Sequence, residues 1–128
     1  MSRDFVYSDL DKDLKIQPDG NIRILYDEDA IRQSLKTIMA TATGERVRST
    51  FGGSLLPLLF EPMDEYLEDT IRIEIERVIT QNEPRVRVQG ILVRANRDNN
   101  SIDVQINVRI KRINRPVRFN TRLRSFAG

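Results

Sequence analysis

Hydrophobic and polar residues alternate most regularly in the second half of the chain. From Ile102 to Lys111, apolar residues occupy every second position, which is typical of a strand with one buried face. A partner strand is expected over Arg85–Ala95, joined through the turn-rich segment 96–100. The alternation changes phase around Gly90, which predicts a bulge there. A third strand is expected after Pro116, with an apolar face formed by Val117, Phe119, Thr121 and Leu123.

The first half of the chain has apolar residues at helical spacing. One helix is expected to start near Asp27–Asp29 and to stop at Thr43-Gly44, where Gly44 can adopt the left-handed conformation of a helix end. A longer helix is expected from about Asp64 to Asn82, ended by Pro84. The predicted buried stripes are Ile31, Leu35, Ile38 and Met39 in the first helix, and Leu67, Ile71, Ile75, Val78 and Ile79 in the second.

Three smaller features complete the pattern. Residues 1–20 are polar and acidic and are expected to form an arm or a short strand. A turn is expected at Pro18–Asn21, followed by a short strand over Ile22–Tyr26. Ser54 is expected to cap a short helix that carries Leu55, Leu56, Leu59 and Phe60. On the long helix, Glu68 with Arg72 and Glu74 with Arg77 have the spacing of ion pairs.

These elements predict an α+β fold in which helices pack on one face of a small, mainly antiparallel sheet. The length of 128 residues suits a single domain that spans residues 1–128, with an arm at 1–20 and a C-terminal extension at 115–128. No apolar run is long enough for a transmembrane helix, and the first residues lack the pattern of a secretory signal, so a cytoplasmic place of synthesis is expected.

The composition excludes several kinds of chemistry. The chain has no cysteine, histidine or tryptophan. Disulfides, thiolate and histidine metal sites, a cysteine nucleophile and a Ser–His–Asp triad are therefore ruled out. No catalytic residue, metal site or cofactor is predicted, and the composition favours a structural or binding role.

Charge is distributed unevenly along the chain. Residues 1–82 contain 10 basic and 16 acidic residues, a net charge of −6, whereas residues 83–128 contain 11 basic and 3 acidic residues, a net charge of +8. This asymmetry fits either a basic face that meets an acidic partner or two halves that neutralise each other inside one fold.

The corner Glu83-Pro84-Arg85 is unusual because Glu83 lies at the C-terminal end of a helix, where the helix dipole disfavours a carboxylate. Pro84 fixes the direction of the chain, and Arg85 opens the next strand. This arrangement predicts a specified polar contact. The alternative is an ordinary solvated ion pair at a corner, with almost no effect on stability.

Several motifs together resemble the contractile-tail baseplate wedge family, whose members are also called tail sheath initiators. The resemblance runs from about residue 5 to residue 112 and includes the family's Glu-Pro-Arg motif between the long helix and the hairpin. The matching motifs are Tyr7-Ser8-Asp9-Leu10-Asp11, Thr43-Gly44-Glu45-Arg46, Phe51-Gly52-Gly53, Leu59-Phe60-Glu61 and Glu83-Pro84-Arg85-Val86.

The resemblance implies a non-enzymatic protein of the virion tail baseplate, related to a type VI secretion baseplate component, with the fold of the sheath "handshake" domain. It implies that Glu83, Pro84 and Arg85 hold the protein on the core bundle of other wedge subunits. It also implies that the sheet templates the tail sheath protein by strand pairing. Tail tube and hub proteins are further candidate partners; nucleic acid and membrane are not.

Two other functions deserve comparison. A lysozyme-like glycoside hydrolase would need paired carboxylates, for which Glu61, Asp64, Glu65, Glu68 and Asp69 are candidates. Most of these lie where acidic residues favour the start of a helix, and an aromatic sugar cleft is not expected. Nucleic-acid binding by the Arg-rich half lacks interleaved aromatics for base stacking.

The last predicted strand carries Arg118 and Arg122 on its polar face and forms or borders a sheet edge. We expect these two arginines, with the Glu-Pro-Arg corner, to bind partners. Truncation after Asn114 would then leave a soluble protein that cannot nucleate sheath, unless Phe119 and Leu123 belong to the core.

Overall fold

The computed structural model describes residues 20–44 and 54–127. Contacts along the chain form two units that divide between Ala30 and Ile31. The predicted acidic arm lies outside the described residues apart from Gly20, and so do the motifs at 45–53. No helix among the described residues is long and apolar enough to cross a membrane.

The first described element is the helix α2, Gly20–Ala42. It starts earlier than the sequence predicted, and the strand expected over Ile22–Tyr26 is wrong because these residues are helical. The alternation there spans only three apolar positions, which is too short a pattern to specify a strand where a helix continues through the segment. The helix ends as predicted: Gly44 has φ of +89° and its N–H donates to the carbonyl of Thr41 at 3.1 Å.

The short helix between the two long ones is the 3-10 helix η1, Leu56–Phe60. The predicted cap by Ser54 is wrong, because Leu55 occupies the N-cap position and no side chain caps the helix. Leu55 and Leu59 are buried, but Phe60 is exposed and stacks on Phe126, with 5.0 Å between ring centroids. A 3-10 helix has three residues per turn, and this spacing directs Phe60 away from the core, which it would face in an α-helix.

The long helix α3, Glu65–Asn82, follows the prediction closely. Asp64 caps its start by accepting a hydrogen bond from the backbone N–H of Leu67 at 2.8 Å. The Glu74–Arg77 pair forms, but the predicted Glu68–Arg72 pair does not. Arg72 instead lies 3.9 Å from Asp69.

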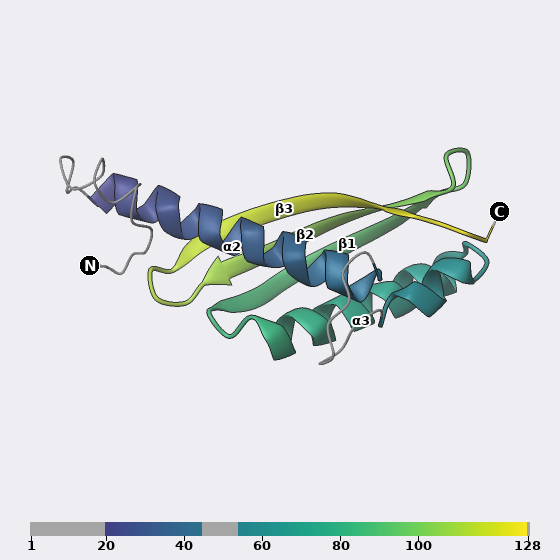
Figure 1. The fold of residues 1–128 in the computed structure, drawn as a ribbon, viewed down its shortest axis with the longest axis horizontal. Coiled ribbons are helices and arrows are strands. Elements are labelled where there is room, and N and C mark those ends of the chain that lie inside the picture. The colour runs from purple at the N-terminus through teal and green to yellow at the C-terminus, as the bar shows by residue number, and fades with distance from the viewer. Residues whose placement is uncertain (1–19, 45–53, 128) are drawn as a thin grey trace. The chain divides into compact units, whose positions relative to one another are not determined.

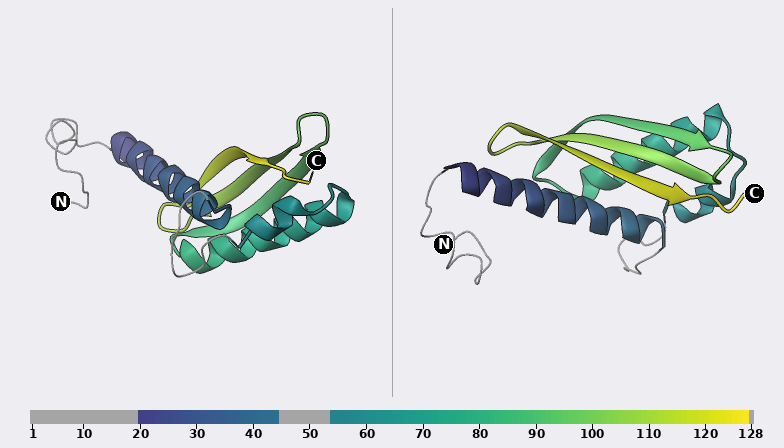
Figure 2. Two further views of the ribbon diagram at one scale, coloured as in Figure 1. Left: turned by 45° about the vertical axis from the view of Figure 1, so that its right-hand side comes forward. Right: turned by 90° about the horizontal axis from the view of Figure 1, so that it is seen from above.

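Three antiparallel strands form one sheet in the order β1-β2-β3. Their bounds are Val86–Asn96, Ser101–Ile110 and Arg115–Arg124. The register shifts between Val88 and Gly90, which confirms the predicted bulge. Figures 1 and 2 show the strands side by side, with α3 along β1.

One face of the sheet is buried and the other is not. On β2, Ile102, Val104, Ile106, Val108 and Ile110 all face the core, as predicted. They pack with the predicted stripes of α3 and of α2 from Ile31 onward. The opposite face is polar, and on β3 every residue of that face is exposed. The α+β fold is therefore as predicted: two helices on one face of a three-stranded antiparallel sheet.

Candidate functional site

The Glu-Pro-Arg corner joins α3 to β1 and is built around a buried carboxylate. Glu83 is the residue that ends α3, its N–H donates to the carbonyl of Ile79 at 2.8 Å, and it is only 3% exposed. Arg85 holds both carboxylate oxygens: its Nε donates to Oε2 at 2.7 Å and its Nη2 to Oε1 at 2.8 Å. This bidentate geometry is the strongest arrangement of an arginine with a carboxylate.

Two further donors complete the shell of this carboxylate. The backbone N–H of Arg85 donates to Oε2 at 3.2 Å, and the hydroxyl of Ser34 on α2 donates to Oε1. Burial opposes ionisation of Glu83, but hydrogen bonds from Arg85 and Ser34 outweigh it and lower the pKa of this carboxyl below 4.5. The corner therefore ties α2 to the start of β1 through one ionised side chain.

The polar contact predicted at the corner thus exists, but Glu83 makes it inside the protein. Arg85 differs from Glu83 because 55% of its side chain is exposed. Pro84 is exposed as well. Glu83 consequently fixes the position of an arginine whose side chain is half exposed. Sequence reasoning did not identify Ser34, whose only signal was a hydroxyl next to an apolar helical stripe.

The third strand β3 forms one edge of the sheet, and its hydrogen bonds can be assigned by register. Ser125 donates to the carbonyl of Asn100 at 2.8 Å, directly beyond the Ser101–Arg124 pair. In an antiparallel ladder, hydrogen-bonded and non-bonded pairs alternate. The odd-numbered residues of β3 therefore bond to β2, and the even-numbered residues point their N–H and C=O groups away from it.

The outward N–H groups of β3 belong to Arg118, Asn120, Arg122 and Arg124. No described residue accepts a hydrogen bond from them. Pro116 occupies an even position too, so its missing N–H costs no ladder bond. The side chains of Arg118 and Arg122 lie on the polar face, where the Nε of Arg118 lies 3.4 Å from Asn107 Oδ1 and that of Arg122 lies 2.8 Å from Asp103 Oδ1. The edge is open, regular and basic.

The opposite edge, on β1, is closed at its two ends and interrupted by the bulge. The N–H of Ala95 donates to Glu68 Oε2 of α3 at 2.7 Å, and that of Val86 lies 3.5 Å from the carbonyl of Glu83. Beyond the strand, Arg97 donates twice to the carbonyl of Met63, at 2.7 and 3.1 Å. Together with the bulge at Gly90, these contacts leave β1 a poor surface for an added strand.

The carboxylates that a hydrolase would need have other roles. Asp64 is a helix cap and Glu68 holds the β1 edge, while Glu61, Glu65 and Asp69 are exposed. No group of acidic side chains in the described ranges could hold a metal ion. These five carboxylates therefore do not form the acid–base pair in a cleft that a glycoside hydrolase needs.

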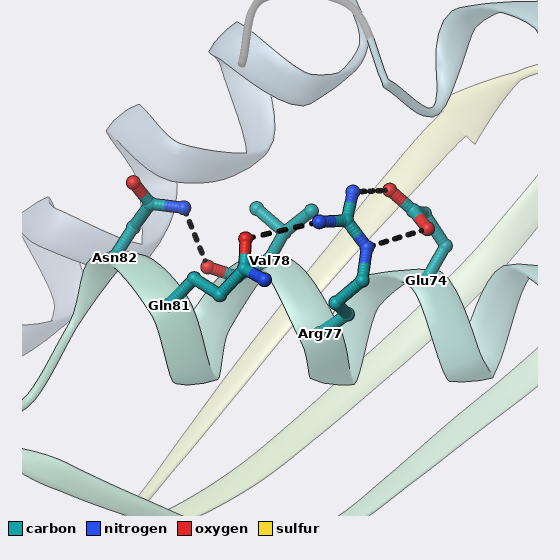
Figure 3. A network of polar contacts seen from close by, with 5 residues as sticks. All are labelled: Glu74, Arg77, Val78, Gln81 and Asn82. Atoms are coloured by element: carbon teal, nitrogen blue, oxygen red, sulfur yellow. Dashed lines mark hydrogen bonds and ion pairs between the residues drawn. The ribbon is translucent and has the colours of Figure 1, made fainter. Parts of the chain in front are cut away.

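A shallow groove lies between η1 and α3, lined in part by Ser54, Leu58 and Ile73. The carboxylate of Glu74 also lines this groove. Figure 3 shows that Arg77 donates hydrogen bonds to this carboxylate and, at 2.9 Å, to Gln81. The hydrogen bond from Arg77 lowers the pKa of Glu74. A glycosidase acid needs a raised pKa, so this groove has the opposite electrostatics.

Comparison with known proteins agrees with this geometry. Residues 26–115 match the model of the family described as baseplate wedge protein gp25. A solved structure from Geobacter sulfurreducens, described as a candidate tail lysozyme, has the same fold with a TM-score of 0.68. The two share 22% sequence identity over 77% of this chain and 91% of that chain, which shows a common fold alone. No curated protein matches the chain.

The family match covers most of the chain, including α3, the Glu-Pro-Arg corner and the β1–β2 hairpin. It agrees with the resemblance found in the sequence motifs. The chain belongs to the gp25 family of baseplate wedge proteins and is a structural component of a phage tail baseplate that interacts with other baseplate components.

Proposed function

We propose that the protein is a non-enzymatic adaptor of the baseplate wedge, assembled in the host cytoplasm, which templates the tail sheath through the β3 edge. The observation that carries this proposal is the contrast between the unbroken edge of β3 and the edge of β1, which a bulge interrupts and Glu68 caps at Ala95. A strand of the sheath protein would pair with the outward groups of β3, and Arg118 and Arg122 would select a partner strand with acidic side chains.

The Glu-Pro-Arg corner is the proposed docking point on the helical core of the wedge. Its support is the half-exposed side chain of Arg85, held in a fixed geometry by the buried Glu83. Positioning by a second residue lowers the entropy that a flexible arginine would lose on binding. In this proposal Pro84 and Arg85 contact the wedge, and Glu83 acts through Arg85.

Strand addition is tested with two proline variants that differ by one position. Asn120→Pro removes an outward N–H, so it blocks strand addition and leaves the β2–β3 ladder intact. Thr121→Pro removes an inward N–H and disturbs the fold. We expect Asn120→Pro protein to join the baseplate but fail to support sheath, as judged by electron microscopy of tails. Normal sheath on Asn120→Pro baseplates would contradict the proposal.

Docking is tested by co-purification of wedge components with Arg85→Ala protein. Arg94→Ala is the matched control, because Arg94 is an exposed arginine of β1, the strand that follows Arg85. We expect Arg85→Ala to abolish co-purification at a temperature where circular dichroism shows it folded, and Arg94→Ala to retain it. Equal retention by both variants would exclude the corner as the docking point.

A lysozyme activity is not favoured. The description of the Geobacter sulfurreducens protein applies to that protein. In this chain Asp64 caps a helix, Glu68 holds a strand and Glu74 pairs with Arg77, while Glu61 and Glu65 are exposed. Purified protein is expected not to clear a suspension of cell walls. Clearing at a catalytic rate that Glu61→Gln or Glu65→Gln abolishes would overturn this expectation.

A further inference from the structure

The outer face of the sheet, which none of the described elements covers, carries an ordered set of arginines. By register, its rows run from β1 across β2 to β3. The described residues of this face include a single acidic side chain, Asp103. The arginines on the face are Arg87, Arg94, Arg109, Arg118, Arg122 and Arg124.

The two halves of this face differ in how their charges are matched. Near the β1–β2 hairpin, Asp103 stands between Arg94 and Arg122, directly opposite both. Near the β2–β3 turn, Arg87 stands directly opposite Arg109, with no carboxylate in that row. Like charges directly opposite each other destabilise a sheet. Facing each other, Arg87 and Arg109 therefore do not stabilise the sheet through their charges.

The contacts of Arg109 and Arg118 in this second half are to neutral oxygens. Arg109 donates to the carbonyl of Asn114 at 3.0 Å, and Arg118 in the next row lies 3.4 Å from Asn107. Gly90 fills the β1 position of that row, and a Cβ at this glycine would meet no atom within 4 Å. Arg118 shares this row with Gly90 and the Arg87–Arg109 row lies next to it, so a side chain added at Gly90 would enter open space beside the rows that carry these arginines.

We propose that this turn-side arginine cluster, Arg87, Arg109 and Arg118, is a docking surface for a carboxylate-rich segment of another baseplate protein. Guanidinium groups pair carboxylates well, and an acidic segment would relieve the Arg87–Arg109 repulsion. A nucleic acid is disfavoured because no aromatic residue lies on this face to stack with bases. The proposal rests on the baseplate role of the family, and it stands if the corner or the β3 edge proves to have another use.

The central experiment substitutes Gly90 with two residues that differ only in charge. Gly90→Glu supplies a carboxylate to the cluster from within the chain, and Gly90→Gln fills the same space without charge. The probe is poly-L-glutamate, with affinity measured by fluorescence anisotropy at low and moderate salt. We expect Gly90→Glu to bind it roughly three- to tenfold more weakly than Gly90→Gln, as expected for one or two exposed ion pairs.

A second comparison separates this cluster from charge in general. The double variant Arg87→Gln with Arg109→Gln is compared with the double variant Arg94→Gln with Arg124→Gln, since each removes two arginines from the same face. We expect only the first to lose affinity for poly-L-glutamate, and its melting temperature to stay equal or rise because a repulsion is removed.

Three results would overturn the proposal. Equal loss of affinity in both double variants would show a diffuse charge effect. A lower melting temperature of Arg87→Gln with Arg109→Gln would show that the two side chains support the fold. Tighter binding of a DNA duplex than of poly-L-glutamate at equal salt would replace the acidic protein segment by a nucleic acid.

Discussion

The two edges of the sheet are built from similar lengths of strand but differ in how their backbone groups are satisfied. The β1 edge is broken by a bulge at Gly90, and Glu68 of α3 accepts the outward N–H of Ala95. The β3 edge has ten residues in unbroken register with β2, and its outward N–H groups have no acceptor among the described residues. An exposed regular edge invites further strands, and proteins usually block it. The β1 edge is thus less suited to strand addition than the β3 edge, and this asymmetry is what the proposed templating role uses.

The largest effect is expected from removing the open edge altogether. Truncation after Asn114 deletes β3, including Val117 and Leu123, which are 3% and 6% exposed. Burial of each such side chain contributes about 1.5–3 kcal/mol, and the loss of the β2–β3 ladder adds to this. We expect the truncated chain to be insoluble or unfolded by circular dichroism. The burial of these positions thus favours the alternative that residues of this strand belong to the core. A soluble, folded truncated protein would show that the fold does not need β3.

The proline pair sharpens the comparison within β3 itself. Thr121→Pro removes the donor to the carbonyl of Val104 on β2, whereas Asn120→Pro removes only an outward N–H. We expect Thr121→Pro to lower the free energy of unfolding by about 1–3 kcal/mol more than Asn120→Pro does, because a ladder hydrogen bond is lost. Urea unfolding of both variants measures this difference. Equal destabilisation would mean that the assignment of inward and outward groups is wrong.

The sequence was most informative where one periodic pattern extended over many residues. The strand over Ile102–Lys111, the α3 stripe and the bulge at Gly90 were all predicted, because side-chain direction in regular elements follows directly from residue spacing. The short strand at Ile22–Tyr26 was wrong, because three alternating residues cannot outweigh a helix that continues through them.

The candidate site was harder to predict than the fold, because its contacts join residues that are distant in sequence. The corner stood out as a carboxylate at an unfavourable helix end, but the hydroxyl of Ser34 lies 49 positions away from Glu83. The bond between Glu68 and Ala95 spans 27 positions and replaced a local ion pair with Arg72 that spacing had suggested. Spacing rules describe neighbours along one element and carry no information about such partners.

The Glu83 carboxylate at the start of the closed edge should make stability depend on acid. Its pKa is lowered in the folded protein, so its contribution is complete above the ordinary value of 4.5 and is lost as the pH falls through the lowered folded value. We expect Glu83→Gln to reduce stability at pH 7 by about 1–2 kcal/mol, because charge-assisted hydrogen bonds are lost. Thermal melts between pH 7 and pH 3 provide the measurement.

In the Glu83→Gln protein, part of the acid-induced loss of stability should disappear, so the melting curves of the two proteins should converge as the pH is lowered. Ser34→Ala is a useful companion, because it removes one donor and leaves the ion pair with Arg85 in place. It should shift the same acid transition by a smaller amount. Parallel pH profiles for wild type and Glu83→Gln would show that Glu83 does not control this transition.

The smallest effect is expected from removing the carboxylate that caps the β1 edge. Glu68→Ala removes the acceptor of the Ala95 N–H near the end of β1, where the bond is partly buried. A lost hydrogen bond of this kind costs about 1 kcal/mol, because water can replace the carboxylate. The more informative consequence concerns association. Without this acceptor the N–H of Ala95 is free to pair with another chain, so the variant should self-associate more at high concentration than wild type. Analytical ultracentrifugation measures this directly, and Glu65→Ala is the matched control because Glu65 is an exposed glutamate of the same helix. If Glu68→Ala stays as monomeric as Glu65→Ala, the bulge at Gly90 is sufficient to protect β1, and the carboxylate contributes only to stability.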